Sequence, residues 1–163
     1  MAVRWSKILL VAAVGLLVLV IAINNISDYT ANFRYVQHVL SMDSVFEDSH
    51  LTWRAVRSPG WQHLVYIAMI ATEVAIALLC LMGSMRLAAV SQEGVEMFHR
   101  AKAIAIYGLT LGFLFWLLGF MVIGGEWFTM WQSSEWNVQA PAFRFLGCVA
   151  LVLIYLTLPN DQV

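Results

Sequence analysis

One carboxylate lies in the middle of an apolar run, where an ionised group is costly. Residues 66–83 read YIAMIATEVAIALLCLMG, and Glu73 is the only charged residue among them. A charged side chain at the centre of a bilayer costs at least about 2.5–3.5 kcal/mol on insertion scales. Glu73 is therefore expected to face the interior of a helical bundle rather than lipid.

Two further polar residues are candidates for the same intramembrane site. Arg144 lies near the start of the last apolar run and Thr110 lies within the third. By residue count Arg144 is several ångströms shallower than Glu73, so their pairing is a hypothesis. Three interpretations of Glu73 stay open. It is a protonated, hydrogen-bonded group that sets helix register, a site for a cation, proton or polar ligand in transport, or a contact to a partner subunit.

A second group of chemistry-bearing residues lies between the first two apolar runs. The candidates for binding on this outer segment are His38, Asp43, Trp53, Arg54 and Trp61. Acidic residues and further histidines accompany them, but no two histidines stand at a recognised metal-ligand spacing. No histidine lies deep in an apolar run, where a membrane haem takes its ligands. The sequence therefore predicts neither a metal nor another cofactor.

Enzyme signatures are missing from the whole sequence. The chain contains no phosphate-binding loop of the P-loop type, no C-x-x-C and no H-E-x-x-H. Serine, histidine and aspartate occur in the outer segment, but no nucleophile motif frames them. We therefore predict a protein that is not an enzyme and has no catalytic residues.

The composition places these residues in a membrane protein. Of the 163 residues, 61% are hydrophobic and 12% are charged, against about 45–50% and about 25% in soluble domains. The net charge of -1 offers no basic surface for nucleic acid. Spans of roughly 20 apolar residues are expected at about 8–26, 59–85, 103–125 and 142–158. The prediction is an all-α bundle of four transmembrane helices forming a single domain, residues 1–163.

The charges near the ends of the spans predict the orientation. Arg4 and Lys7 precede the first span, and Arg86, Arg100 and Lys102 flank the second connection. The third connection has no lysine or arginine, so the positive-inside rule places both termini in the cytoplasm. A long structured outer loop is then expected at about 27–58. Most tryptophans fall on the outer side, as an aromatic belt or as a platform for a partner.

Local patterns add detail to the outer loop and to the third span. Phe33, Val36 and Leu40 recur at helical spacing, which predicts a short amphipathic helix. Gly108 and Gly112 form a G-x-x-x-G pair that allows another helix to approach closely. That helix belongs either to the same chain or to another subunit.

The outer segment resembles a bacterial family of predicted small integral membrane proteins of unknown function. The residues that carry the resemblance are HVLSMDSVF at 38–46, TWRAV at 52–56 and a following span with a single glutamate, here Glu73. The chain departs from the family pattern mildly, at Ser44, Val45 and Val56. The specific part covers only about residues 33–73. The resemblance implies a bacterial inner-membrane protein and brings no activity.

Three functions remain open on the sequence alone. The first is a non-catalytic accessory or assembly subunit of a larger membrane complex, since catalytic motifs are missing and outward aromatics are many. The second is a homo-oligomeric small transporter or channel that uses Glu73. The third is a membrane protein that binds or senses a ligand on the periplasmic side. The expected partners are membrane lipids and either other membrane subunits or further copies of the chain, and not nucleic acid.

Overall fold

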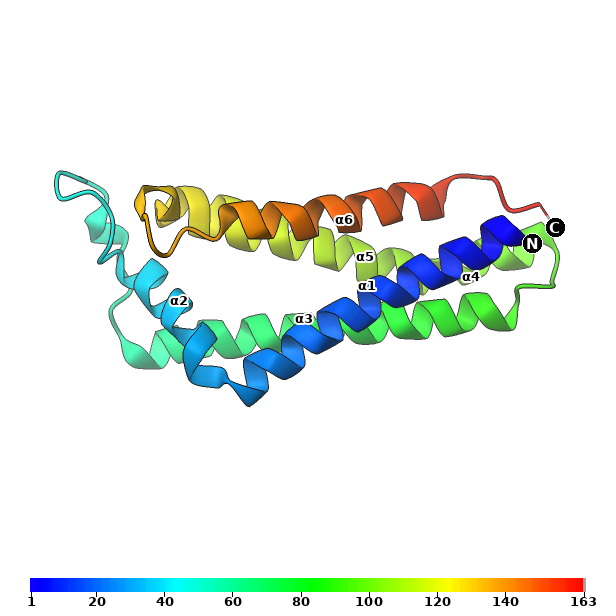
Figure 1. The fold of residues 1–163 in the computed structure, drawn as a ribbon, viewed down its shortest axis with the longest axis horizontal. Coiled ribbons are helices and arrows are strands. Elements are labelled where there is room, and N and C mark those ends of the chain that lie inside the picture. The colour runs from blue at the N-terminus through cyan, green and yellow to red at the C-terminus, as the bar shows by residue number, and fades with distance from the viewer. Residues whose placement is uncertain (163) are drawn as a thin grey trace. The chain divides into compact units, whose positions relative to one another are not determined.

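The computed structural model describes residues 1–162, and no strand occurs among them. The chain can be followed from its N-terminus to its C-terminus by colour in Figure 1. The elements are α1 (Ala2–Ser27), α2 (Tyr29–Ser41), the 3-10 helix η1 (Thr52–Arg54), α3 (Pro59–Ala89), α4 (Val95–Ala101), α5 (Ala103–Leu114), the π-helix η2 (Phe115–Trp127), the 3-10 helix η3 (Met130–Gln132) and α6 (Gln139–Thr157).

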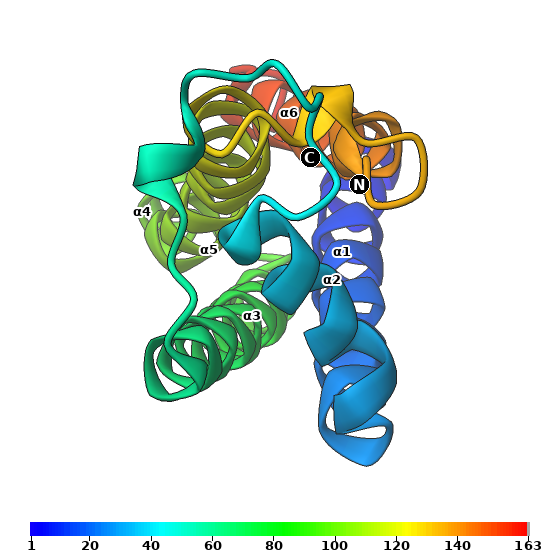
Figure 2. The ribbon, with the colours of Figure 1, turned by 90° about the vertical axis from the view of Figure 1, so that its left-hand side faces the viewer.

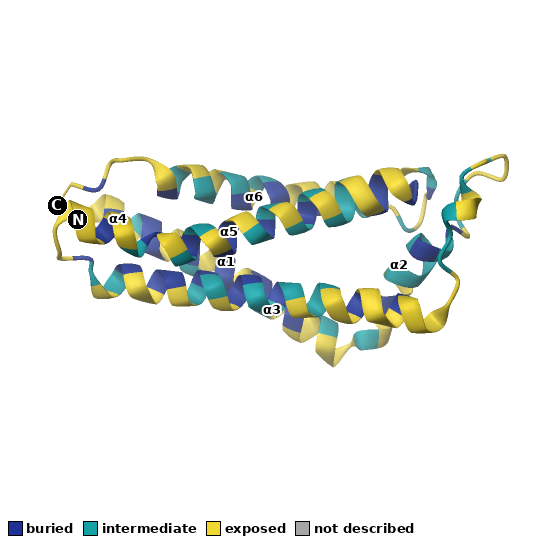
Figure 3. Ribbon diagram, turned by 180° about the vertical axis from the view of Figure 1, so that it is seen from behind, coloured by how far each residue is buried: buried dark blue, intermediate teal, exposed yellow. Residues whose placement is uncertain are grey.

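Four helical stretches are long and apolar enough to cross a membrane. They are Ala2–Ser27, Pro59–Ala89, Val95–Trp127 and Gln139–Thr157. The third comprises α4, α5 and η2. The prediction of an all-α protein with four transmembrane helices is therefore confirmed. Helices suit this environment because each satisfies its own backbone hydrogen bonds where water is missing. Exposed positions recur along every long helix, and many are leucine, isoleucine or valine (Figure 3).

The chain divides into two compact units, and each long stretch contributes to both. Unit 1 consists of Met1–Ala22, Glu73–Phe113 and the described residues of Gly147–Val163. Unit 2 consists of Ile23–Thr72 and Leu114–Leu146. The following paragraphs describe each unit separately.

Glycines bring the helices of unit 1 close together. A Cβ atom placed on Gly83 of α3 would lie 2.6 Å from the backbone N and Cα of Ala105 in α5. On Gly108 of α5 it would lie 2.9 Å from the backbone N of Cys80 in α3. Real Cβ atoms do not approach other atoms so closely, so the α3–α5 packing requires glycine at both positions.

Unit 2 begins with the short amphipathic helix that the sequence predicts. Phe33 and Leu40 of α2 are buried. Met42 caps the C-terminus of α2 with a left-handed backbone (φ 51°). Leu40, Met42 and Phe128 form a small core. The backbone N–H of Val56 donates to the carbonyl of Leu40 at 2.7 Å. The segment between α2 and α3 is thus attached to α2, and Figure 2 shows both.

Candidate functional site

An apolar cavity of about 300 Å³ lies in unit 2. Helix α2 contributes Tyr35 and Val39 to its wall, α3 contributes Val65 and Met69, and η2 contributes Phe120 with other apolar residues. Cavities of about 300–1,000 Å³ that are mainly apolar are typical of small-molecule sites. The cavity therefore has the size and chemistry of a site for an apolar group.

The cavity is not sealed. Tyr35 and Ile123 both line it, and they are 38% and 49% exposed on the surface of the protein. Ile123 lies within the third apolar stretch, Val95–Trp127. The lining of the cavity therefore continues to the exposed apolar surface of this stretch.

The wall that η2 provides is unusual, because η2 is a π-helix of 13 residues. The i→i+5 pattern continues past its end, where Phe128 N–H donates to the carbonyl of Ile123 at 2.9 Å. π-Helical turns are rare and occur frequently at functional sites. Gly119 and Gly124 of η2 both line the cavity. A Cβ atom placed on Gly119 would meet nothing within 4 Å, so this glycine leaves space open.

Thr129 follows the π-helix in a strained conformation. Its φ of 50° is left-handed, which is a genuine outlier for a β-branched residue. Its hydroxyl is buried and has no hydrogen-bond partner within residues 1–162. Its two neighbours in the chain, Phe128 and Met130, line the cavity. Strain of this kind costs of order 1–3 kcal/mol and clusters at ligand sites.

Two further buried polar atoms of unit 2 are unpartnered among the described residues. They are Oε1 of Gln62 and Nε of Arg54. The amide nitrogen of Gln62 donates to Ser41 Oγ at 2.9 Å and to the Val56 carbonyl at 2.8 Å. A buried polar atom without a partner costs about 1–3 kcal/mol, more when it is charged. Such atoms require an explanation in any folded protein.

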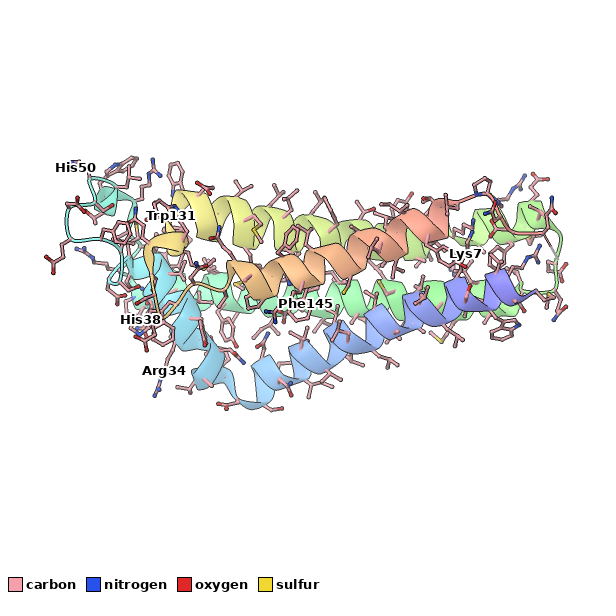
Figure 4. All side chains as sticks on the ribbon, turned by 45° about the horizontal axis from the view of Figure 1, so that its top comes forward. Lys7, Arg34, His38, His50, Trp131 and Phe145 are labelled. Carbon is pink, nitrogen blue, oxygen red and sulfur yellow. The ribbon has the colours of Figure 1, made fainter. Side chains whose placement is uncertain are left out.

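Two of the candidate binding residues, His38 and Asp43, lie in contact in unit 2. His38 Nδ1 lies 2.9 Å from Asp43 Oδ2. The His38 ring stacks on Trp136 with centroids 4.2 Å apart, and Tyr35 meets the edge of the same indole at 4.9 Å. Figure 4 shows His38 on α2. No three metal-binding side chains are grouped for a metal ion within residues 1–162.

Arg54 joins two of the predicted outer aromatics. Its guanidinium lies 4.5 Å from the ring centroid of Trp127 and 5.4 Å from that of Trp53. One Nη donates to the Trp127 carbonyl at 3.2 Å. Trp61, the remaining candidate of this segment, is 62% exposed in the first turn of α3. The structure thus groups Trp53 and Arg54 with Trp127, which sequence reasoning did not include in the site.

The predicted intramembrane residues differ in burial. Glu73 is 4% exposed and interacts with another group of the protein. Thr110, which belongs to the same unit, is exposed on α5. Arg144 is exposed on the part of α6 that belongs to unit 2. The involvement of these residues in one polar site stays a prediction.

The predicted glycine pair packs inside unit 1. Gly108 and Gly112 are both buried on α5. The close approach of Gly108 to Cys80 favours the interpretation that this pair serves packing within the chain. The face of α5 that carries Gly108 is therefore covered by α3.

A buried ion cluster in unit 1 was not predicted from the sequence. Asp161 Oδ1 accepts a hydrogen bond from Lys7 at 2.7 Å, and Oδ2 accepts one from Lys102. His99 Nε2 lies 2.7 Å from Oδ2. The side chain of Asp161 has no exposed surface. Figure 4 labels Lys7, which lies near the N-terminal end of α1 and belongs to this cluster.

Arg4 completes the cluster by capping backbone carbonyls. Its Nε donates to the Asp161 carbonyl at 2.9 Å, and one Nη donates to Ser91 and Glu93 carbonyls at 2.8 and 2.6 Å. Lys7 also donates to the Leu158 carbonyl at 2.6 Å, just beyond the end of α6. Cations at a helix C-terminus satisfy carbonyls that have no intrahelical donor. The cluster therefore ties the chain after α6 to α1 and α4.

Electrostatics favours the ionised form of Asp161. Burial alone would raise its pKa, but hydrogen bonds and charge from Lys102 and Lys7 outweigh burial and hold the pKa below its ordinary value. Arg4, Lys7 and Lys102 entered the sequence argument only as markers of orientation. The sequence contained one signal for this cluster. Three cations flank the spans, and one acid, Asp161, follows the last span.

The comparisons with known proteins agree with a membrane protein. A family model described as "predicted small integral membrane protein (DUF2165)" matches residues 3–159, nearly the whole chain. The description names no activity. Comparison with curated proteins and with solved structures finds no match.

Proposed function

This chain belongs to the family of predicted small integral membrane proteins (DUF2165), and we propose that it is a non-catalytic binding protein for a lipid-like molecule. One hydrocarbon chain of that molecule occupies the cavity of unit 2. The cavity, framed by the π-helix η2, is the observation that carries the proposal. The proposal develops the third function drawn from the sequence, ligand binding on the outer side.

The energetics of an apolar cavity support an apolar occupant. Apolar atoms that line unfilled space forfeit dispersion contacts of about 0.1–0.2 kcal/mol per atom pair, so an unfilled apolar cavity of about 300 Å³ carries a free-energy cost. Water does not relieve the cost, because a water molecule needs 2–4 polar partners that an apolar wall does not offer. A hydrocarbon chain relieves it through dispersion contacts.

Access to the cavity supports the same occupant. The exposed lining residue Ile123 lies on a transmembrane stretch, so we propose that a hydrocarbon chain enters sideways from the bilayer. A molecule dissolved in water would have to cross the headgroup region first. We propose further that the protein resides in a bacterial inner membrane with cytoplasmic termini. The cations of unit 1, Arg4, Lys7 and Lys102, support this orientation.

Gly119→Leu tests the proposal by filling the cavity. The new side chain enters open space, so the fold is expected to persist. Gly147→Leu is the matched control, because Gly147 also has nothing within 4 Å, lies in the last span and does not line the cavity. Native mass spectrometry after detergent exchange measures the lipid retained per chain. We expect the wild type and Gly147→Leu to retain about one lipid, and Gly119→Leu to retain at least about tenfold less.

Equal retention by the two leucine variants would contradict the proposal. Circular dichroism and elution volume show that both variants are folded before their lipid content is compared. Lipid at the general protein surface is unaffected by Gly119→Leu and so cannot reproduce the expected difference.

A second candidate function is contact with another membrane protein, as in an accessory or assembly subunit. Phe46 and Trp131 pair edge to face at 5.8 Å, and they are 52% and 48% exposed. Trp53 is 71% exposed. Exposed aromatic residues are enriched at the centres of protein interfaces. The mass of the complex extracted from native membranes in mild detergent tests this function, and Trp131→Ala should release a partner that binds there.

A further inference from the structure

We infer that Trp53, Arg54 and Trp127 form a surface site for the phosphate of an anionic phospholipid, outside the cavity of unit 2. These three residues are called the Arg54 cluster below. The inference goes beyond the proposed function, because none of the three residues lines the cavity. It adds a second lipid site and the class of lipid that this site selects.

The three side chains of the Arg54 cluster contact one another. The guanidinium carbon of Arg54 lies 4.5 Å from the ring centroid of Trp127 and 5.4 Å from that of Trp53. The two indole rings meet edge to face, with their centroids 6.1 Å apart. One Nη of Arg54 donates to the carbonyl of Trp127 at 3.2 Å. A planar, weakly hydrated guanidinium suits this position over aromatic rings better than an ammonium group does.

The Arg54 cluster is accessible from outside the protein. Trp53 and Trp127 are 71% and 47% exposed, and Arg54 is half-buried. Nε of Arg54 is buried and one Nη donates to Trp127, so the second Nη is the charged donor that remains for a ligand. An indole N–H is a donor as well. An incoming acceptor therefore meets both a charged and a neutral donor at this surface.

The charge of Arg54 is not balanced by a carboxylate of unit 2. None of the ion pairs among residues 1–162 includes Arg54. Glu126 adjoins Trp127 in the chain and is exposed, but it does not pair with Arg54 either. Hydrogen bonds from arginine to phosphate or carboxylate are about twice as strong as neutral ones. The cluster therefore favours an anionic oxygen from outside the chain.

The position of the cluster identifies the source of this oxygen. Trp127 is the last residue of the apolar stretch Val95–Trp127, and Arg54 shortly precedes the stretch Pro59–Ala89. The ends of membrane spans lie at the level of the lipid head groups, where tryptophan is enriched. The anionic groups that surround a protein at this level are the phosphates of phospholipids. The occupant to which these observations point is thus a phospholipid head group.

The same contacts disfavour a choline head group. A quaternary ammonium ion binds well over an aromatic ring, but Arg54 already lies over the rings of Trp53 and Trp127. A trimethylammonium group at this site would also meet a like charge. The cluster should therefore select a phospholipid with a net negative head, such as phosphatidylglycerol, over phosphatidylcholine.

The experiment titrates two lipids with identical acyl chains onto the purified full chain after delipidation. Phosphatidylglycerol and phosphatidylcholine are added in mild detergent, and native mass spectrometry measures the bound fraction. We expect the wild type to prefer phosphatidylglycerol about tenfold and Arg54→Gln to lose this preference. Arg57→Gln is the matched control, because Arg57 is an exposed cation of the same segment, and it should keep the preference. An unchanged preference in Arg54→Gln would overturn the inference.

Two conservative variants test the aromatic part of the site. Arg54→Lys keeps the charge but loses the planar group over the rings, so phosphatidylglycerol binding should fall severalfold. Trp127→Phe keeps a ring but removes the indole donor, and it should cause a smaller loss. Circular dichroism and elution volume show that each variant is folded before its binding is compared. Equal binding by Arg54→Lys and the wild type would reduce the site to general charge and overturn the Arg54 cluster.

Repeating the titration in Gly119→Leu separates this inference from the proposed function. The preference for phosphatidylglycerol should persist in Gly119→Leu, because the cluster lies outside the cavity. If Gly119→Leu retains as much lipid as its control while Arg54→Gln still loses the preference, the proposed function fails and this inference stands. If Gly119→Leu alone abolishes the preference, the selecting site is the cavity and this inference falls.

Two further outcomes identify a different occupant. Inorganic phosphate at the concentration of the lipid should not displace phosphatidylglycerol, and displacement would assign the cluster to free phosphate. A protein that co-purifies with the wild type from native membranes and is lost from Arg54→Gln, with the lipid preference unchanged, would assign it to a protein interface. Either result would overturn the phospholipid site.

Discussion

Unit 1 and unit 2 are built from the same four apolar stretches but treat buried polar groups in opposite ways. In unit 1 the carboxylate of Asp161 accepts hydrogen bonds from Lys7 and Lys102. In unit 2, Gln62, Thr129 and Arg54 each keep a buried atom without a partner among the described residues. One Nη of Arg4 is the single such atom of unit 1.

The packing of the two units differs as well, because it is close in unit 1 and leaves space open in unit 2. Gly83 and Gly108 bring the backbones of α3 and α5 together in unit 1, where an added Cβ would clash. Gly119 in unit 2 faces open space beside the cavity. Natural sequences break the rules of packing and polar satisfaction mainly at functional sites. The difference supports the proposal that unit 2 is the binding region, with the buried ion cluster of unit 1 acting as a structural clamp.

The largest expected effect is the loss of the clamp through Asp161→Asn. The substitution leaves Lys7 and Lys102 buried without their counter-charge, which costs about 3–5 kcal/mol when a buried pair is broken. Unfolding in detergent, followed by circular dichroism against denaturant, measures the change. Glu96→Gln is the control, because it breaks an exposed ion pair with Arg100 that is worth at most about 1 kcal/mol. Similar effects of both substitutions would remove the contrast between clamp and surface.

A smaller effect is expected from acid. Because the pKa of Asp161 in the folded protein is below its ordinary value of 3.8, the unfolded chain binds the proton first. The stabilisation by Asp161 is complete above the ordinary pKa and is lost as the pH falls through the lowered one, by at most about 1.4 kcal/mol per pH unit. Melting temperatures between pH 6 and pH 3 measure the loss. Asp161→Asn should lack this component, and an identical acid profile in the variant would refute the assignment.

The smallest expected effect is a gain of stability from Thr129→Gly in unit 2. Glycine adopts a φ of 50° without a steric cost, and the change also removes the unpartnered hydroxyl. We expect a stabilisation of about 1 kcal/mol, although glycine substitutions usually destabilise. Thr129→Ala, which keeps a Cβ in the strained backbone, should gain less. A loss of stability in the glycine variant would show that Thr129 serves the fold rather than a ligand.

Sequence reasoning found some members of the candidate site and missed others. It named Arg54, Trp53, His38 and Asp43, because charged and aromatic residues are conspicuous in a segment between apolar runs. It did not name Gln62 or Thr129. Both are ordinary polar residues at the edge of a span, and only their burial without a partner distinguishes them.

Sequence reasoning treated the intramembrane acid Glu73 as the main polar feature and therefore did not predict the buried ion cluster around Asp161. Lys7 and Asp161 are separated by 154 positions in the chain. Each is individually typical of a residue beside a membrane span. Their pairing depends on how α1 and the chain after α6 pack in unit 1, which no local pattern contains.

The sequence alone determined that this is an α-helical membrane protein with four spans and an amphipathic α2. These properties follow from composition and from the 3.6-residue period, which are local and need no partner segment. Only the tertiary structure decided which buried polar groups are paired, where η2 becomes a π-helix and where an apolar cavity remains. These depend on side chains from distant segments meeting in one place, so their physical cause lies in packing rather than in the order of neighbouring residues.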